Sequence, residues 1–253
     1  MGREIVSKII YNREIAGEIF EIRVAGEKDL SFVPGQFGNI KIDSKELLLR
    51  RPISINAYDK KSGEMVFLYK VVGKGTRKLT EAKTGDDISI LAPLGNGFNV
   101  LENYMNICLV GGGIGCAPLE SIMDKYPEKS YRTFLGFDTK KSIYHKSDFE
   151  RKSDKFFITT EDGSLGEKGF VTEPLKKQIE TDPPDVVYAC GPTPMLKALK
   201  NTIYPYEIKA FVSVEERMGC GIGGCAVCVC KTTTGYKKAC VVGPVFELDK
   251  VVF

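Results

Sequence analysis

Alternating apolar and polar positions dominate the first hundred residues of the chain. In the stretch GEIFEIRVAG, residues 17–26, the alternation places Phe20, Ile22 and Val24 on one face of a strand. Further strand-like runs, separated by Gly and Pro, lie at 34–42, at 51–72 as a hairpin around the loop 59–63, and at 88–95. A series of short strands like these predicts a closed antiparallel β-barrel over residues 1–99.

One helix is expected within this β region. The stretch RKLTEAK, residues 77–83, is rich in helix-forming residues, and Gly85 follows it as a stop signal. Thr76, the last residue of the sequence GKGT, is placed to cap the beginning of this helix. The sequence therefore predicts a short helix that begins directly after Thr76.

The pattern changes to alternating strands and helices from about residue 100. The apolar run NICLV, residues 106–110, is typical of a buried parallel strand, and the turn after it leads into a helix with Pro118 in its first turn. Strand-like and helix-like runs then alternate as far as residue 203. This alternation predicts a parallel, doubly wound nucleotide-binding α/β domain over residues 100–207.

The remaining residues, 208–253, form a third segment that is rich in cysteine. It ends in two short apolar runs, ACVVG at 239–243 and VFELDKVVF at 245–253, both of which we expect to be strands. The chain is therefore expected to combine a β-barrel, an α/β domain and a small C-terminal module.

Composition fits a globular chain of two domains and a small third, since it has 253 residues, of which 43% are hydrophobic and 27% charged. The net charge of +3 is spread along the chain, so no basic block favours a nucleic-acid partner. No apolar run approaches the roughly 20 residues of a membrane span, and the N-terminal MGREIVSKII lacks the apolar core of a signal peptide. We expect a cytoplasmic protein with neither nucleic-acid nor membrane partners.

This expected compartment changes how the eight cysteines are interpreted. The cytosol is reducing, so clustered thiols there favour metal binding or redox chemistry over disulfides. Cys108, Cys116 and Cys190 are dispersed among apolar or Gly-rich residues, and burial without reactivity is the plain interpretation for them. Four others gather in MGCGIGGCAVCVC, residues 218–230.

The turn GGGIG, residues 111–115, follows a strand and opens a helix. At such a place a phosphate can contact free backbone N–H groups at the positive end of the helix dipole. Because the spacing is not G-x-G-x-x-G, an ordinary tight turn stays open as the alternative. Cys190 and Gly191 end a later strand and should lie at the same sheet edge. Asp138, after the second strand, could accept a ribose hydroxyl and favours NAD over NADP.

The strand RRPISI carries Arg51 and Ser54, with Pro52 and Ile53 between them. Arginine can pair with a phosphate through two N–H groups. The sequence GKGT, residues 73–76, precedes the expected helix and could hold further phosphate. An Arg–Pro strand and a Gly turn without a ligand are the alternative that these residues leave open.

PGQF, RPIS, GKGT, GGGIGCAPL and ACGPTPML occur in an order and spacing that resemble the ferredoxin-reductase superfamily over about residues 1–205. In that superfamily the barrel binds a flavin and the α/β domain presents NAD(P)H. The resemblance implies that Arg51 contacts the FAD pyrophosphate, that Ser54 contacts the isoalloxazine edge, and that Cys190 lies near the nicotinamide as the one candidate catalytic residue. Further contacts are implied for FAD at Leu68, Tyr69, Lys70, Gly75 and Thr76, and for NADH at Gly112, Gly113, Gly115 and Gly191.

The cysteine-rich segment has the spacing C-x4-C-x2-C at Cys220, Cys225 and Cys228, and eleven residues then precede Cys240. Four thiolates with the first three spaced in this way are typical of a [2Fe–2S] cluster, and the intervening glycines would let N–H groups reach the sulfurs. A zinc ribbon prefers two separated C-x2-C pairs, so zinc is the less favoured alternative. Cys230 is a further thiol that we expect not to bind iron.

Together with ACVVGPVFELDKVVF, this segment resembles the family of electron-transfer subunits of NAD-dependent, type 1B dihydroorotate dehydrogenases, and the likeness covers the whole chain. The resemblance implies FAD and [2Fe–2S] in this chain. It also implies a separate FMN-containing dihydroorotate dehydrogenase catalytic subunit as partner, two of each forming a heterotetramer. Electrons from dihydroorotate would then pass from FMN through the cluster and FAD to NAD⁺, in pyrimidine biosynthesis.

A flavin between NAD and the cluster is chemically necessary, because NADH gives two electrons at once and an iron–sulfur cluster takes one. No strong general base is needed, and we expect His145, the one histidine, in an exposed turn without a catalytic role. Two alternatives are open. One is a small subunit of an NADH–ferredoxin:NADP reductase or a sulfide dehydrogenase. The other is a zinc-bearing interaction module without turnover.

Overall fold

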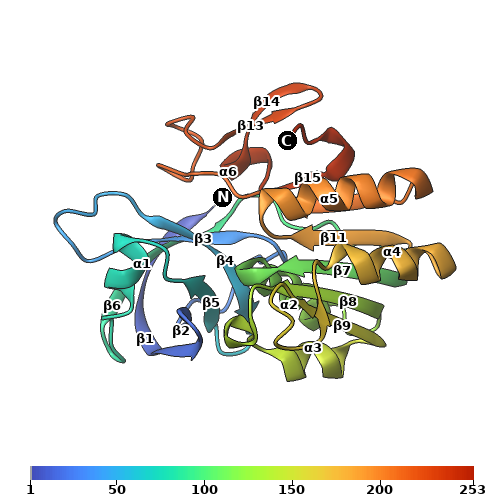
Figure 1. The fold of residues 1–253 in the computed structure, drawn as a ribbon. Helices are drawn as coiled ribbons and strands as arrows, with labels where there is room; N and C mark the ends of the chain where they lie inside the picture. Colours follow the sequence, from blue (N-terminus) through green and yellow to red (C-terminus); the bar gives the residue numbers. More distant parts are fainter. Residues whose placement is uncertain (1) are drawn as a thin grey trace.

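The computed structural model describes residues 2–253 and places a barrel beside an α/β domain, with a smaller C-terminal part above both (Figure 1). The barrel closes in the order β1-β2-β5-β4-β3-β6, with antiparallel neighbours. Its strands are β1 (Arg3–Ala16), β2 (Ile19–Val24), β3 (Phe37–Ile40), β4 (Arg51–Tyr58), β5 (Met65–Lys70) and β6 (Asp87–Leu94). The predicted closed antiparallel barrel is confirmed.

Strand β5 shows why the barrel and the α/β domain pack tightly together. Its sequence MVFLYK is almost wholly apolar, and both of its faces are buried. Met65, Phe67 and Tyr69 belong to the core inside the barrel, whereas Val66 and Leu68 belong to a core shared with the α/β domain. A strand with two buried faces needs a continuous apolar run of this kind.

Helix α1 (Lys74–Leu79) begins three residues earlier than the sequence predicted. Thr76 is inside the helix, and Gly73 is the capping residue. The Thr76 hydroxyl accepts hydrogen bonds from the N–H groups of Val72 and Gly73, at 3.0 and 3.3 Å. The prediction that Thr76 caps the helix was therefore wrong, because its hydroxyl reaches back to the N–H groups that precede the helix.

The α/β domain is built on a sheet in the order β10-β9-β8-β7-β11-β12-β15. All neighbours are parallel except β15, which runs antiparallel to β12. The strands are β7 (Asn106–Gly112), β8 (Ser130–Phe137), β9 (Lys155–Thr160), β10 (Glu167–Lys168), β11 (Val186–Cys190), β12 (Ala210–Ser213) and β15 (Val245–Glu247). The predicted doubly wound parallel sheet is confirmed.

Helices cover both faces of this sheet (Figure 1). They are α2 (Ala117–Lys125), α3 (Lys146–Lys152), α4 (Thr172–Thr181) and α5 (Thr193–Ile203). Along β7, Ile107 and Leu109 join the core with α2 and α3, whereas Cys108 and Val110 join the core with α4 and α5. None of the helices in residues 2–253 has both the length and the apolar character needed to cross a bilayer.

The C-terminal part consists of the hairpin β13 (Val229–Thr232) and β14 (Gly235–Lys238), helix α6 (Ala239–Val242) and strand β15. The prediction of a strand over residues 239–243 was wrong, because this run turns back as a helix toward Cys228. The N–H of Ala239 donates to the Cys228 carbonyl at 2.8 Å. Val241 and Val242 stay about half exposed, so their apolar character reflects no buried strand.

The third segment also shares the sheet of the second. Strands β12 and β15, both after residue 207, complete one edge of the α/β sheet. Lys200 of α5 donates to the carbonyls of Asp249 and Val251, at 3.3 and 2.8 Å. The limits at residues 99 and 207 stay predictions, and the cysteine-rich part is fixed firmly to the α/β domain.

Candidate functional site

Two Gly-rich turns meet at the carboxyl ends of neighbouring strands. Cys190 of β11 is the register partner of Gly111 of β7. A Cβ atom on Gly115 would lie 2.5 Å from the carbonyl oxygen of Cys190, so only glycine allows the two turns to touch. Gly113 has a φ of +53° and no neighbour within 4 Å of its Cβ position. The turn is thus closed toward Cys190 and open at Gly113, where a phosphate could approach.

Cys190 lies at this junction as a neutral thiol. Burial raises the pKa of the Cys190 thiol to about 12, although a hydrogen bond with Ser213 opposes this shift. Burial also raises the pKa of Cys108 to about 12 and that of Cys116 well above its usual value. Because the thiolate is the nucleophilic form, the surroundings of these cysteines favour packing over covalent chemistry.

The predicted flavin residues Arg51 and Gly75 come together from β4 and α1. A side chain at position 75 would overlap the Arg51 guanidinium, which lies directly over Gly75. The guanidinium donates to the carbonyl of Leu49 and exposes its outer edge. RPIS and GKGT, which eighteen residues separate in the sequence, therefore form one basic corner of the barrel.

The other predicted flavin residues line β4 and β5. Ser54 is partly exposed beside the buried Ile53. Leu68 and Tyr69 have side-chain exposures of only 1% and 2%, so they present no side-chain surface to a ligand. The Tyr69 hydroxyl donates to the Asn12 side chain at 2.9 Å inside the barrel.

Lys70 ends β5 and reaches the α/β domain. Its Nζ lies 3.9 Å from Oδ2 of Asp138, the residue predicted to bind the ribose. Burial would raise the pKa of the Asp138 carboxyl, but hydrogen bonds with Ser142 and Thr139 and the charge of Lys70 lower it. Asp138 is thus a charged acceptor that is more than half exposed, as recognition of a ribose hydroxyl requires.

A cavity of about 870 Å³ opens where the three parts of the chain meet. Its size is within the usual range for a site that binds a cofactor. The barrel contributes Arg51 and Pro52 to its lining, and α5 contributes Thr193. The segment 215–218, which follows β12, also lines the cavity. Of the predicted FAD residues, Arg51 and Pro52 line this space, and Thr193 lies two residues after the predicted NAD residue Gly191.

The four predicted iron ligands form two pairs. Amide N–H groups of Ile222 and Cys225 both donate to Cys220 Sγ at 3.4 Å, and the N–H of Cys220 donates to Cys225 Sγ at 3.3 Å. In the second pair, the N–H of Cys240 donates to Cys228 Sγ at 3.4 Å. The backbone N–H groups that donate to Cys220 Sγ, above all that of Ile222, lower the pKa of the Cys220 thiol to about 6. The thiolate is the form that would bind iron, so these surroundings suit the predicted role of Cys220.

The paired arrangement fits a two-iron cluster. A [2Fe–2S] cluster takes two thiolates on each of two irons. Cys230, by contrast, is buried and its Sγ contacts the Lys237 carbonyl at 3.6 Å. It is engaged in the β13–β14 hairpin.

The cysteine loop is hydrogen-bonded to the flavin barrel. Asn39 of β3 is fully buried, and its Nδ2 donates to the carbonyl of Cys220 at 3.2 Å. Gly221 has a φ of +75°, and a Cβ atom there would lie 2.6 Å from this Nδ2. Because Asn39 is the register partner of Pro52, the predicted cluster lies one strand away from the RPIS motif.

Comparison with known proteins identifies the family to which the chain belongs. The chain is 42% identical over 260 residues to the dihydroorotate dehydrogenase B (NAD(+)) electron transfer subunit of Lysinibacillus sphaericus (strain C3-41), covering 99% of both chains. It is 42% identical over 252 residues to the corresponding subunit of Bacillus pumilus (strain SAFR-032), covering 96% of both. The chain belongs to the family of dihydroorotate dehydrogenase B electron transfer subunits.

Three domain families match this electron transfer subunit in succession. They are an oxidoreductase FAD-binding domain at residues 4–98, an oxidoreductase NAD-binding domain at 109–201, and an iron–sulfur cluster binding domain of dihydroorotate dehydrogenase B at 215–252. The predicted cofactors FAD, NAD and an iron–sulfur cluster are confirmed at the level of these domains. The chain is an oxidoreductase subunit that transfers electrons.

Solved structures agree with the fold. The NADH-dependent reduced ferredoxin-NADP oxidoreductase superposes with a TM-score of 0.87 at 32% identity, covering 97% of this chain and 89% of that one. A ferredoxin NADP+ reductase from Neisseria gonorrhoeae with bound FAD and NADP superposes with a TM-score of 0.69 at 14% identity, covering 81% and 92%. The latter likeness shows the ferredoxin-reductase fold alone.

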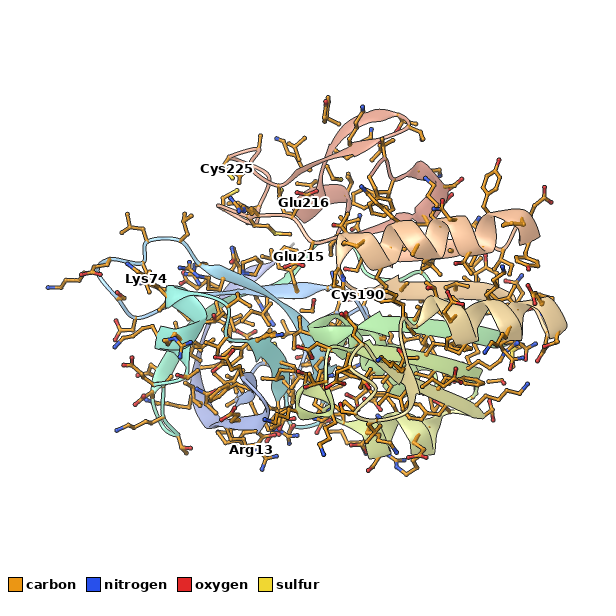
Figure 2. The ribbon with its side chains drawn as sticks, viewed as in Figure 1. Arg13, Lys74, Cys190, Glu215, Glu216 and Cys225 are labelled. Carbon is orange, nitrogen blue, oxygen red and sulfur yellow. The ribbon has the colours of Figure 1, made fainter. Side chains whose placement is uncertain are left out.

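The sequence did not single out several residues at the common cavity of this electron transfer subunit. Glu215, Glu216, Arg217 and Met218 line it, in the segment that leads from β12 to the cysteine loop. Figure 2 shows Glu215 between Cys190 and the part that carries Cys225. Burial raises the pKa of Glu216. The signal was available, since VEER, residues 214–217, follows β12 at its carboxyl end, where ligands bind in parallel sheets.

His145 was placed wrongly by the sequence. The expectation of an exposed turn fails because its side chain is only 20% exposed, between two buried carboxylates. Those carboxylates, Glu21 and Glu120, come from different domains and are nearly a hundred residues apart in the sequence. No local pattern of residues signals such a meeting.

Proposed function

We propose that this chain carries electrons between NAD and a separate, FMN-containing dihydroorotate dehydrogenase catalytic subunit, with two copies of each subunit in a heterotetramer. The dihydroorotate is oxidised in the partner, and the electrons leave as NADH in the cytoplasm. The observation that carries this proposal is the order of the three cofactor domains, with the cysteine pairs next to the flavin strand.

The chain's own residues have distinct roles in this proposal. Arg51, over Gly75, neutralises the FAD pyrophosphate, while Ser54 meets the isoalloxazine edge. The open turn at Gly113 receives the NAD phosphates, and Asp138 accepts a hydrogen bond from the ribose. Cys190 limits the space beside the nicotinamide as a neutral thiol. A bound flavin supplies the conversion between paired and single electrons.

The surface around the cysteine loop supports a protein partner at this end of the molecule. Ile222, Val227, Val241 and Val242 are between 45% and 63% exposed, and each lies within a few residues of a predicted iron ligand. Clustered apolar side chains on a surface are typical of interaction sites. Cys225 is itself exposed, so single electrons can leave on the same side.

The test is a visible and EPR spectrum of the anaerobically purified chain before and after NADH is added. We expect flavin and iron–sulfur absorbance, bleaching by NADH and the EPR signal of a reduced [2Fe–2S] centre. The isolated chain should form no orotate from dihydroorotate, and addition of the FMN subunit should restore orotate formation with NAD⁺. A chain loaded with zinc and no flavin would refute the proposal, as would orotate formation by the chain alone.

A second candidate is a small subunit of an NADH–ferredoxin:NADP reductase, because the structural match to the NADH-dependent reduced ferredoxin-NADP oxidoreductase covers nearly the whole chain. The higher identity to dihydroorotate dehydrogenase B subunits favours the first proposal. Identification of the subunit that co-purifies with the tagged chain separates the two. An FMN-containing dihydroorotate-oxidising partner supports the first, and a ferredoxin-reducing NADP enzyme supports the second.

A further inference from the structure

A network of buried polar side chains joins the barrel to the α/β domain away from the cofactor cavity. His145 lies just before α3, and its Nδ1 is 2.7 Å from Glu120 Oε2 of α2. Its Nε2 is 3.1 Å from Glu21 Oε2 of β2, in the barrel. The two carboxylates have side-chain exposures of only 7% and 8%. One imidazole ring therefore bridges two buried carboxylates from two domains.

The geometry defines the charge of this bridge. A carboxylate oxygen can only accept, so both ring nitrogens must donate and the ring is an imidazolium. Burial alone would lower the pKa of His145, but hydrogen bonds with Glu120 and Glu21 raise it to about 10. Further donors complete the network, because Lys152 Nζ lies 3.2 Å from Glu120, and the Tyr11 hydroxyl and Arg13 contact Glu21.

The same network reaches the strand predicted to bind flavin. Asn56 is on β4, two residues after Ser54, and it is only 3% exposed. Its Nδ2 donates to Glu120 Oε2 and to the carbonyl of Ala117, both at 3.0 Å. Ala117 is the first residue of α2 and lies two residues after Gly115, the last residue of the Gly-rich turn. The flavin strand is thus hydrogen-bonded to the end of the nucleotide turn.

A third contact holds the turn itself. The hydroxyl of Tyr144, the neighbour of His145, lies 3.2 Å from the carbonyl oxygens of both Gly113 and Ile114. His145 has a φ of +48°, a left-handed conformation that the two neighbouring contacts hold in place. The pair Tyr144–His145 therefore ties the Gly-rich turn to the barrel.

The rest of this domain boundary combines apolar contacts with separate, more exposed polar ones. The N–H of Gly17 donates to the Lys141 carbonyl and Lys125 Nζ donates to the Phe32 carbonyl, both at 2.8 Å. Ile19, Val66 and Leu68 of the barrel meet Leu119 and other apolar residues of the α/β domain. Apolar contacts stabilise association without fixing direction, whereas satisfied buried polar networks specify one arrangement. The polar network is therefore suited to define how the two domains are set against each other.

We propose that His145 and Asn56 are positioning residues that hold the nucleotide-binding turn in register with the flavin strand, and so set the approach of nicotinamide to flavin for hydride transfer. The inference rests on the proposed exchange of electrons between NAD and FAD in this chain. Neither residue touches a reacting atom. A displacement of about 1 Å in such an approach can cost on the order of a hundredfold in rate.

The test compares two variants with a matched control. His145→Asn removes the bridge but suits the left-handed backbone, which asparagine tolerates. Asn56→Ala removes the hydrogen bonds from β4 to Glu120 and Ala117. This variant tests the proposal if His145→Asn fails to fold. The control is Arg132→Met, which breaks the ion pair between the buried Arg132 and the half-exposed Asp182, 3.0 Å apart and both within the α/β domain.

The first readout is anaerobic stopped-flow reduction of the bound flavin by NADH. We expect both variants to lower the limiting rate at least roughly tenfold, with little change in the half-saturating NADH concentration, and to weaken the long-wavelength charge-transfer absorbance between nicotinamide and flavin. The Arg132→Met protein should match the wild type in both. Variants with the wild-type limiting rate and charge-transfer band would overturn the proposal.

The second readout needs no cofactor. Amide hydrogen exchange over residues 113–117 should speed up in His145→Asn and Asn56→Ala and stay unchanged in Arg132→Met. If the wild-type chain took no electrons from NADH, the proposed function would fail, and this exchange alone would decide whether the network holds the turn. Unchanged exchange in both variants would overturn the inference in either case.

Discussion

Lys70 of the barrel and Asp138 of the α/β domain lie 3.9 Å apart, Nζ to Oδ2, across the boundary between the two predicted cofactor sites. The lysine ends the strand predicted to line the flavin, and the aspartate is predicted to bind the NAD ribose. Lys140 and Lys141 follow within three residues of Asp138. One carboxylate thus lies beside the Lys70 ammonium, with two further lysines close in sequence, at the position predicted to distinguish NAD from NADP.

Asp138→Ser should weaken the binding of NADH and allow NADPH to bind and reduce the flavin. Loss of a charged acceptor costs about 1.5 to 3 kcal/mol, which corresponds to a rise of roughly 10- to 100-fold in the half-saturating NADH concentration. Lys70, freed from the carboxylate, would attract the 2′-phosphate, so NADPH should become the better donor. Flavin reduction measured with both nucleotides checks this. As a control, Asp162→Asn changes another exposed carboxylate of the same domain and should leave the preference for NADH intact.

Gly113→Ala should weaken NADH binding beyond its effect on stability. Gly113 and Gly85 both have positive φ and no neighbour within 4 Å of the Cβ position. An alanine at either site should therefore cost about 1 to 2 kcal/mol of unfolding free energy. Only the alanine at 113 places a methyl group where the phosphates would approach. Equal half-saturating NADH concentrations in Gly113→Ala and Gly85→Ala would contradict the assignment of this turn.

Much of the fold was predictable because its cues are local. The apolar run NICLV lies within strand β7, and the alternating run GEIFEIRVAG contains strand β2. The two Gly-rich turns were also placed together correctly, because strand ends in a parallel sheet share one edge. The spacing of the cysteines predicted Cys220, Cys225, Cys228 and Cys240 as iron ligands, and this assignment stays a prediction.

The failures arose where distant residues decide a local state. Ala239–Val242 is a helix because its N–H groups turn toward Cys228, which lies eleven residues earlier than Ala239. His145 is enclosed by carboxylates from a barrel strand and from α2. Burial of a polar residue depends on which distant chain segments pack on it. A periodic pattern of apolar residues predicts local secondary structure but not these contacts.

Cys220→Ser and Cys240→Ser should each lose the iron–sulfur cluster while the chain keeps its flavin. Each change removes one thiolate from a different pair, so one iron would lack a ligand in both cases. The measurement is iron and acid-labile sulfide per mole of flavin, together with the visible spectrum. Cys230→Ser is the matched control, since this thiol contacts the Lys237 carbonyl and should be dispensable for iron. Loss of iron from Cys230→Ser with retention in Cys240→Ser would reassign the fourth ligand.

The bridge at His145 should make stability depend on pH in a defined window. Its folded pKa of about 10 lies above the ordinary 6.5, so its contribution is complete below pH 6.5 and declines as pH rises toward 10. Burial would raise the pKa of Glu21, yet hydrogen bonds with His145 and Tyr11 lower it to about 2 from 4.5. The Glu21 contribution is therefore complete above pH 4.5 and declines as pH falls toward 2.

His145→Asn should accordingly lower the free energy of unfolding by about 3 kcal/mol between pH 4.5 and 6.5, because removal of one partner leaves buried carboxylates uncompensated. The loss should shrink steadily toward pH 10, where the wild-type ring gives up its proton. Tyr11, Arg13 and Lys152 also face the network, so each pH point is taken as a difference from wild type in urea unfolding. Arg132→Met should show no such decline above pH 6.5, because arginine keeps its charge. A loss in His145→Asn that stayed constant from pH 6 to 10 would mean that shape, and not the imidazolium charge, holds the domains together.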